Sequence, residues 1–139
     1  MSLKFALIMA RILLIDDDDC FRTVLRMTLA YFGHTVIEAC DGNEGLALFP
    51  QANADLVITD LVMPEKNGTE VIMELRKKSP PVKIIAMSGG DRGNGANSLG
   101  AAKAAGAAKV LAKPFSHKIL IEVISDLLPD ETPGAPIGA

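Results

Sequence analysis

The segment from Arg11 to Asp19 reads RILLIDDDD, so a continuous apolar run ends abruptly in four consecutive carboxylates. Continuous apolar runs are typical of strands in a parallel sheet, because helices cover both of its faces. In open parallel sheets, ligands bind beyond the carboxyl ends of the strands. The segment therefore predicts a central strand at residues 11–15, with acidic side chains where such a sheet has its site.

Four further apolar runs follow this one, and a helical pattern separates each run from the next. They predict strands at residues 35–39, 56–59, 82–87 and 109–112. Strands that alternate with helices indicate βαβ units, in which the strands are parallel. Five such units predict a doubly wound α/β fold, (βα)5, with a five-stranded parallel sheet of order 2-1-3-4-5.

The apolar residues between the strands recur at helical spacing, so a helix is expected after each strand. The first helix is predicted to stop at Gly33. Its expected apolar face consists of Phe21, Val24, Leu25, Thr28, Leu29 and Phe32. Asp41 with Glu44 resembles a capping box, which predicts a short helix to Phe49. A third helix is expected at about residues 69–78.

Two more helices complete the pattern. An alanine-rich helix that runs to Ala105 is expected after a glycine-rich loop at residues 89–95. Ser116 is the expected cap of the last helix. The apolar residues assigned to the packed face of that helix are Ile119, Leu120, Val123, Ile124, Leu127 and Leu128.

The composition indicates one domain without a membrane span. The chain has 139 residues, 49% of them apolar, and an average domain takes roughly 100 to 200 residues. Its 14 basic and 17 acidic residues give a net charge of −3, which argues against a nucleic-acid-binding module with a basic stripe. The longest apolar stretch, residues 5–15, is shorter than the roughly 20 residues of a membrane helix. A cytoplasmic location is therefore expected.

Cys20 and Cys40 are too few for a disulfide scaffold in a chain of this length. Neither lies in a CxxC motif, and the histidines, His34 and His117, are far apart, so the usual spacing of a zinc site is absent. We interpret both cysteines as small apolar side chains of a protein in a reducing compartment.

The domain itself is expected at residues 11–128. Residues 1–10 are interpreted as an N-terminal extension or a cloning remnant, since Met9 offers a second start. Residues 129–139 are rich in Pro, Gly and Ala, which predicts a flexible tail or a truncated linker.

Polar side chains follow four of the five predicted strands. They are Asp16 and Asp17 after the first strand, Asp60 after the third, Ser88 after the fourth and Lys113 after the fifth. Neighbouring strands lie about 4.8 Å apart, so the three carboxylates are expected to converge and to need a cation or a proton. Carboxylates suit Mg²⁺, a lysine suits a phosphoryl group, and a serine hydroxyl can donate to it.

Four segments resemble the receiver domain of two-component response regulators. They are Arg11-Ile-Leu-Leu-Ile-Asp-Asp-Asp18, Asp60-Leu-Val-Met-Pro-Glu-Lys-Asn-Gly68, Met87-Ser88-Gly89 and Lys113-Pro-Phe115. The motifs occur in the order and spacing of that family, and the resemblance covers about residues 11–128. Asp-x-x-Met-Pro-x-x-x-Gly is a specific motif, and the Asp pair and Lys-Pro-Phe add to it. The resemblance implies a flavodoxin-like fold.

The resemblance also implies a phosphorylation-controlled switch. Asp60 would take a phosphoryl group from a sensor histidine kinase or a histidine phosphotransfer protein. The implied Mg²⁺ ligands are Asp16, Asp17, Asp60 and the backbone carbonyl of Val62. Lys113 would pair with the phosphoryl oxygens, and Ser88 would hydrogen-bond them after its loop shifts. Such a domain is a signalling module with weak self-phosphorylation and autodephosphorylation chemistry, and not an enzyme.

The output implied by the resemblance is a change in one face of the domain. This face comprises the helix that ends at Ala105, the strand at residues 109–112 and the last helix, and it would bind a downstream protein or a second copy of the chain. Direct binding of nucleic acid or membrane by this chain is not expected. The family's aromatic position on the last strand is Val110 here, and the loop after Ser88 is longer and glycine-rich, so the readout of the signal is expected to differ.

Other protein classes share parts of this pattern. A flavodoxin-like cofactor protein needs a hydroxyl-rich phosphate loop where residues 16–19 are acidic. A P-loop needs Lys-Ser/Thr where Ala96-Asn97 follows the Gly90…Gly95 spacing, and a dinucleotide fold needs its glycines after the first strand. A phosphatase of the haloacid dehalogenase type needs a second Asp where Val62 stands. A pseudo-receiver, which binds partners without being phosphorylated, stays open.

Overall fold

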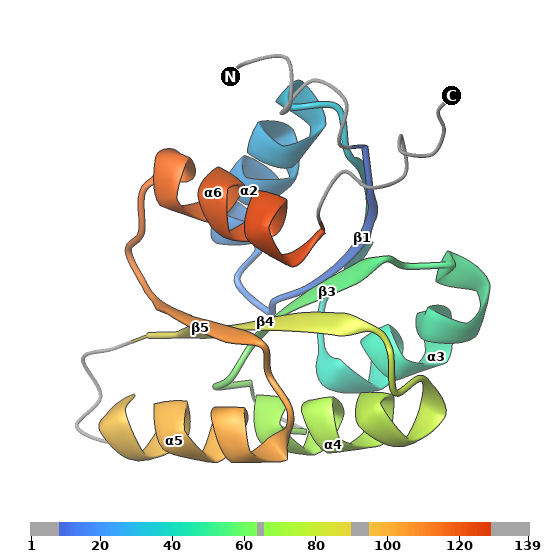
Figure 1. Cartoon of the computed structure of the whole chain (residues 1–139), viewed down its shortest axis with the longest axis vertical. Helices are drawn as coiled ribbons and strands as arrows, with labels where there is room; N and C mark the ends of the chain where they lie inside the picture. Colours follow the sequence, from blue (N-terminus) through green and yellow to red (C-terminus); the bar gives the residue numbers. More distant parts are fainter. Residues whose placement is uncertain (1–8, 64–65, 90–94, 129–139) are drawn as a thin grey trace.

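Five parallel strands form one sheet in the order β2-β1-β3-β4-β5, which confirms the predicted topology (Figure 1). The structure is a computed structural model and describes residues 9–63, 66–89 and 95–128. The strands are β1 (Arg11–Ile15), β2 (Thr35–Ala39), β3 (Leu56–Asp60), β4 (Lys83–Ser88) and β5 (Lys109–Ala112). Compared with the prediction, β3 also includes Asp60, and β4 begins and ends one residue later.

Helices cover both faces of this sheet, as Figure 1 shows. One face is covered by α2 (Asp19–Tyr31) and α6 (His117–Leu127). The other is covered by α3 (Gly42–Ala52), α4 (Gly68–Lys78) and α5 (Gly95–Ala105). Side chains alternate between the two faces: in β1, Ile12 and Leu14 pack into the cluster with α2 and α6, and Leu13 packs into the other. The central strands are therefore apolar on both sides.

Side chains at the helix starts fix where the helices begin. Asp18 caps α2, Asp41 caps α3, and Ser116 caps α6, each accepting a hydrogen bond from a backbone N–H of the first turn. Gly33 follows α2 with φ of +96°, a left-handed conformation that favours glycine and explains the predicted stop. Glu44 accepts from the backbone N–H of Cys40 rather than from that of Asp41, so the predicted capping box is formed one residue earlier.

Two predictions about helices α3 and α6 are wrong in detail. Helix α3 does not stop at Phe49 but continues through Pro50 to Ala52, and it ends at Asn53 with φ of 50°. In α6, Ile119 is 44% exposed, and Ile121 is buried in its place. Six of the eleven residues of α6 are aliphatic, so the pattern fits more than one face, and packing against the sheet selects the face that contains Ile121.

The predicted apolar face of α2 is also partly wrong, because Val24 is 55% and Phe32 is 38% exposed. A groove of about 420 Å³ lies on this side of α2; it is lined by Val24, Met27, Thr28, Tyr31, Phe32 and His117. Cys20 and Cys40 are free and exposed. Cys20 lies in the first turn of α2, and Cys40 directly follows β2.

Candidate functional site

Three carboxylates meet at the carboxyl edge of the sheet, as the strand ends predict. One oxygen from each of Asp16, Asp17 and Asp60 lies within 4.8 Å of the other two. Asp16 follows β1 and is fully buried, Asp17 is exposed, and Asp60 ends β3 with 6% exposure. The parallel pairing of β1 with β3 brings these residues together from distant parts of the sequence.

Lys113 brings a positive charge to this cluster. Its Nζ lies 3.0 Å from Oδ2 of Asp16 and 3.5 Å from Oδ2 of Asp60, and its side chain is 18% exposed. The same Nζ lies 4.1 Å from the centroid of the Phe21 ring, and this ring packs edge-on against Phe115. The Phe21 ring therefore covers one side of the ammonium group and leaves its charge directed at the carboxylates.

The Asp60 carboxyl group is unusually basic for an aspartate. Burial raises its pKa to about 6 from 3.8, and the negative charge of Asp16 acts in the same direction. The charge of Lys113 and hydrogen bonds from the backbone N–H groups of Val62 and Leu61 act in the opposite direction. The Leu61 N–H donates to Oδ1 at 2.9 Å, which leaves Oδ2 on the side of Lys113. Asp60 is therefore a carboxylate at pH 7, but a destabilised one.

Ser88 and Val62 lie next to this cluster. Ser88 ends β4 and is buried, and its carbonyl accepts a 2.7 Å hydrogen bond from the backbone N–H of Lys113. That bond extends the β4–β5 pairing by one step and sets where the Lys113 side chain begins. Val62 follows Asp60 by two residues, and its side chain is 56% exposed. Of the predicted loop at 89–95, residues 90–94 lie outside the described residues.

Gly68 holds the chain that follows Asp60 in place. Its N–H donates to the Leu61 carbonyl at 3.0 Å, and a Cβ atom at this position would collide with the Asp60 carbonyl oxygen and lie 2.6 Å from the Leu61 Cα. Only glycine permits this close approach of two backbone segments. The last residue of the Asp-x-x-Met-Pro-x-x-x-Gly motif thus fixes the backbone of the first.

The residues at this edge fit a hard divalent cation. Three converging carboxylates offer oxygen ligands and three negative charges, and Mg²⁺ prefers oxygen ligands and keeps part of its water shell. Asp17 is exposed at the open side, so water has access to the same point. Lys113 neutralises one of the charges, and the net charge of the group still favours a cation.

Two side chains at this site were not found by sequence reasoning. Arg22 donates from Nη1 to the carbonyl oxygen of Asp16 at 2.6 Å, and Phe21 stacks against Lys113. Both lie in the first turn of α2, shortly after the acidic run. Their position in the sequence carries a weak signal, because the first turn of a helix that follows a strand still lies close to the end of that strand.

Comparisons with known proteins place the chain in a family. A family model described as the response regulator receiver domain matches residues 12–125. The DNA-binding transcriptional regulator NtrC of Azospirillum brasilense is 38% identical over 132 residues, which are 94% of this chain and 26% of NtrC. A crystal structure of a response regulator receiver domain protein from Clostridium thermocellum superposes with a TM-score of 0.81 and 29% identity, and covers 88% of this chain and 97% of that one.

A second solved structure is a complex with Mg²⁺-BeF. It is the response regulator TrrA of Thermotoga maritima in complex with Mg²⁺-BeF, with a TM-score of 0.73 and 35% identity over 85% of this chain and 98% of that one. The chain described here therefore belongs to the response regulator receiver domain family, a family of signalling domains. It spans about a quarter of the length of NtrC. Among the described residues, no helix combines the length and apolar character of a membrane span.

Proposed function

We propose that this chain is a phosphorylation-controlled switch in which Asp60 accepts a phosphoryl group. The donor is a sensor histidine kinase or a histidine phosphotransfer protein, and the reaction depends on Mg²⁺. One observation carries the proposal: Lys113 Nζ lies 3.5 Å from the Asp60 carboxylate and 3.0 Å from that of Asp16. A cation thus stands beside the acceptor oxygen, where the charge of a phosphoryl group has to be neutralised.

In the phosphoryl transfer, one bond to phosphorus forms and one breaks. A carboxylate oxygen of Asp60 attacks phosphorus, a P–O bond forms, and the P–N bond to the donor imidazole breaks, with its electron pair going to the imidazole nitrogen. Asp60 has to be ionised for this attack, and with a pKa of about 6 it is at neutral pH. Asp16, Asp17, Asp60 and the backbone carbonyl of Val62 would hold the Mg²⁺ ion, which would supply positive charge to the phosphoryl oxygens. Lys113 and the Ser88 hydroxyl hold the oxygens that remain.

Acetyl phosphate tests the proposal without a protein donor. With Mg²⁺, intact-mass spectrometry should show one added phosphoryl group on the wild-type chain and none on Asp60→Asn. Glu122→Gln, on the exposed side of α6, is the matched control and should be labelled like the wild type. Equal labelling of Asp60→Asn would refute the assignment of the acceptor. A wild-type chain that stays unlabelled with Mg²⁺ would favour the pseudo-receiver, which binds partners without phosphorylation.

The output face is the finer part of the proposal. It comprises the edge strand β5 together with α5 and α6, which cover opposite faces of the sheet (Figure 1), and it would bind a downstream protein or a second copy of the chain. Val110 on β5 is half-buried, and its short β-branched side chain offers little difference in packing between two states. We therefore expect beryllium trifluoride to shift the amide NMR signals of residues 88–97 strongly and that of Val110 weakly. The reverse pattern would contradict this.

A further inference from the structure

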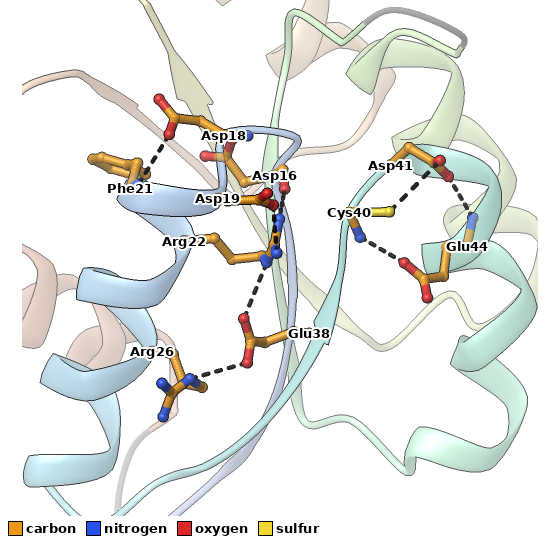
Figure 2. A network of polar contacts seen from close by, with 10 residues as sticks. All are labelled: Asp16, Asp18, Asp19, Phe21, Arg22, Arg26, Glu38, Cys40, Asp41 and Glu44. Atoms are coloured by element: carbon orange, nitrogen blue, oxygen red, sulfur yellow. Dashed lines mark hydrogen bonds and ion pairs between the residues drawn. The ribbon is translucent and has the colours of Figure 1, made fainter.

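Arg22 joins three segments of the chain around the acidic cluster, as Figure 2 shows. Its Nη1 donates to the Asp16 carbonyl oxygen at 2.6 Å, Nη2 to Asp19 Oδ1 at 2.8 Å, and Nε to Glu38 Oε1 at 3.0 Å. The side chain is only 14% exposed, although arginine usually lies at the surface. The planar guanidinium therefore spans the end of β1, the start of α2 and the last part of β2.

Glu38 and Asp19 do not contribute equally to the anchoring of Arg22. Glu38 is 34% exposed and also binds Arg26, whose Nε lies 2.9 Å from its Oε2, so both of its oxygens are engaged. Asp19 is 82% exposed, and ion pairs of such exposed groups are weak. Glu38 therefore sets the orientation in which Arg22 reaches the Asp16 carbonyl.

The contact with the Asp16 carbonyl acts on Asp17. The carbonyl oxygen of Asp16 and the amide nitrogen of Asp17 belong to one planar peptide group. A donor that fixes the oxygen therefore also fixes the orientation of the peptide plane that leads into Asp17. Asp16 is held from other sides as well, by Lys113 at Oδ2 and by the Asp18 N–H at Oδ1. The Asp17 carboxylate, by contrast, makes no hydrogen bond or ion pair with any other residue that the structure describes.

We propose that Arg22 is a positioning residue, which orients the Asp16–Asp17 peptide and thereby places the Asp17 carboxylate for binding a divalent cation. The inference rests on the proposed function, because it assigns the cation to the same acidic cluster. Arg22 also adds positive charge near the cluster, which opposes cation binding. The two effects have opposite signs and are therefore separable by experiment.

Two substitutions at Arg22 separate its effect on the orientation of the peptide from the effect of its charge. Arg22→Lys keeps the positive charge but loses the planar fork, so it cannot hold the carbonyl and Glu38 in one geometry. Arg22→Gln removes the charge together with the fork. The matched control is Arg26→Lys, because Arg26 contacts the other oxygen of Glu38 and, among the described residues, does not reach Asp16. Glu38→Gln leaves Arg22 in place and removes its charged anchor.

The experiment is a titration of the full chain with Mg²⁺ alone, followed through backbone amide NMR shifts. Arg22→Lys should weaken Mg²⁺ binding about tenfold, as loss of an outer-shell partner commonly does, and should shift the Asp17 amide signal in the metal-free spectrum. Glu38→Gln should weaken binding less, and Arg26→Lys should stay within about twofold of the wild type. The free energy of unfolding in urea, measured for each variant, separates positioning from general loss of stability.

Several outcomes would overturn the inference. If Arg22→Lys binds Mg²⁺ like the wild type, or if Arg22→Gln binds it more tightly, the charge of Arg22 matters and its geometry does not. If Arg26→Lys weakens binding as much as Arg22→Lys, the network is only structural. A wild-type chain that binds Mg²⁺ but is not labelled by acetyl phosphate refutes the proposed function alone. Labelling of the wild type with equal Mg²⁺ affinities of all variants refutes the role of Arg22 alone, and no Mg²⁺ binding at all refutes both.

Discussion

Replacing Asp60 by asparagine should stabilise the cation-free protein, and the gain should depend on pH. Asn keeps an oxygen that accepts from the Leu61 N–H, but it carries no charge in a position that is only 6% exposed. Lys113 keeps its ion pair with Asp16 at 3.0 Å, so no other buried charge loses its closest partner. The substitution therefore removes mainly the cost of burying an ionised carboxylate.

The size of this gain follows from the pKa of Asp60. Burial raises the pKa to about 6 in the folded chain, against 3.8 for an ordinary aspartate. At about 1.4 kcal/mol for each pH unit, this difference corresponds to a cost of about 3 kcal/mol. Below pH 3.8 the group is protonated in both the folded and the unfolded chain, so the cost is absent. As the pH rises towards 6, the unfolded chain loses the proton first, and the free energy of unfolding falls.

Urea unfolding in EDTA between pH 4 and pH 8, followed by circular dichroism, measures this dependence. The difference in unfolding free energy between Asp60→Asn and the wild type should grow by about 2.4 kcal/mol from pH 4 to pH 7 and then stay nearly constant. Added Mg²⁺ should reduce the difference, because a cation favours the ionised carboxylate. Glu122→Gln, at an exposed position of α6, should show no such growth. Parallel stability curves of Asp60→Asn and the wild type over this range would refute the reasoning.

Three further predictions concern the surroundings of Asp60. Gly68→Ala places a methyl group against the Asp60 carbonyl and should lower the unfolding free energy, measured in urea, by about 1–3 kcal/mol. Gly100→Ala on α5 is the control: its methyl group would meet no atom within 4 Å, and it should raise the unfolding free energy by about 0.5–1 kcal/mol. Asp17→Ala should weaken Mg²⁺ binding and raise cation-free stability, because one of three repelling carboxylates is removed; an unchanged affinity in the titration would contradict this. Val62→Asn should shorten the lifetime of the phosphoryl group, since its amide can orient an attacking water, and an unchanged dephosphorylation rate would exclude that role.

The convergence of the acidic residues and Lys113 was predictable because it depends on topology alone. The carboxyl ends of parallel strands share one edge, so residues that end β1, β3 and β5 meet there whatever the packing of the helices. The register of the sheet places the residues along this edge. Asp60 pairs with Met87, and Ser88 pairs with Ala112, so Lys113 lies one residue beyond the end of the β4–β5 pairing. Nothing about side-chain conformation is needed for this prediction.

The errors concern features that depend on how helices pack. Val24 and Phe32 fit the apolar period of α2, but period alone does not give the rotation of the helix against the sheet. Arg22 was missed for the same reason: its 2.6 Å contact with the Asp16 carbonyl requires the position of the α2 axis relative to β1 and β2.

The low exposure of Asp60 links the stability of the domain to its chemistry. An ionised carboxylate with 6% exposure costs the folded chain free energy, and this cost is the source of the raised pKa. Whatever neutralises the charge, a proton, a divalent cation or the replacement of aspartate by asparagine, recovers part of that free energy. The same burial reduces the screening of Lys113 by water, so its attraction for an anion at Asp60 is stronger than at the surface. A more exposed aspartate at this position would leave the fold more stable, but it would also couple the fold less strongly to whatever binds there.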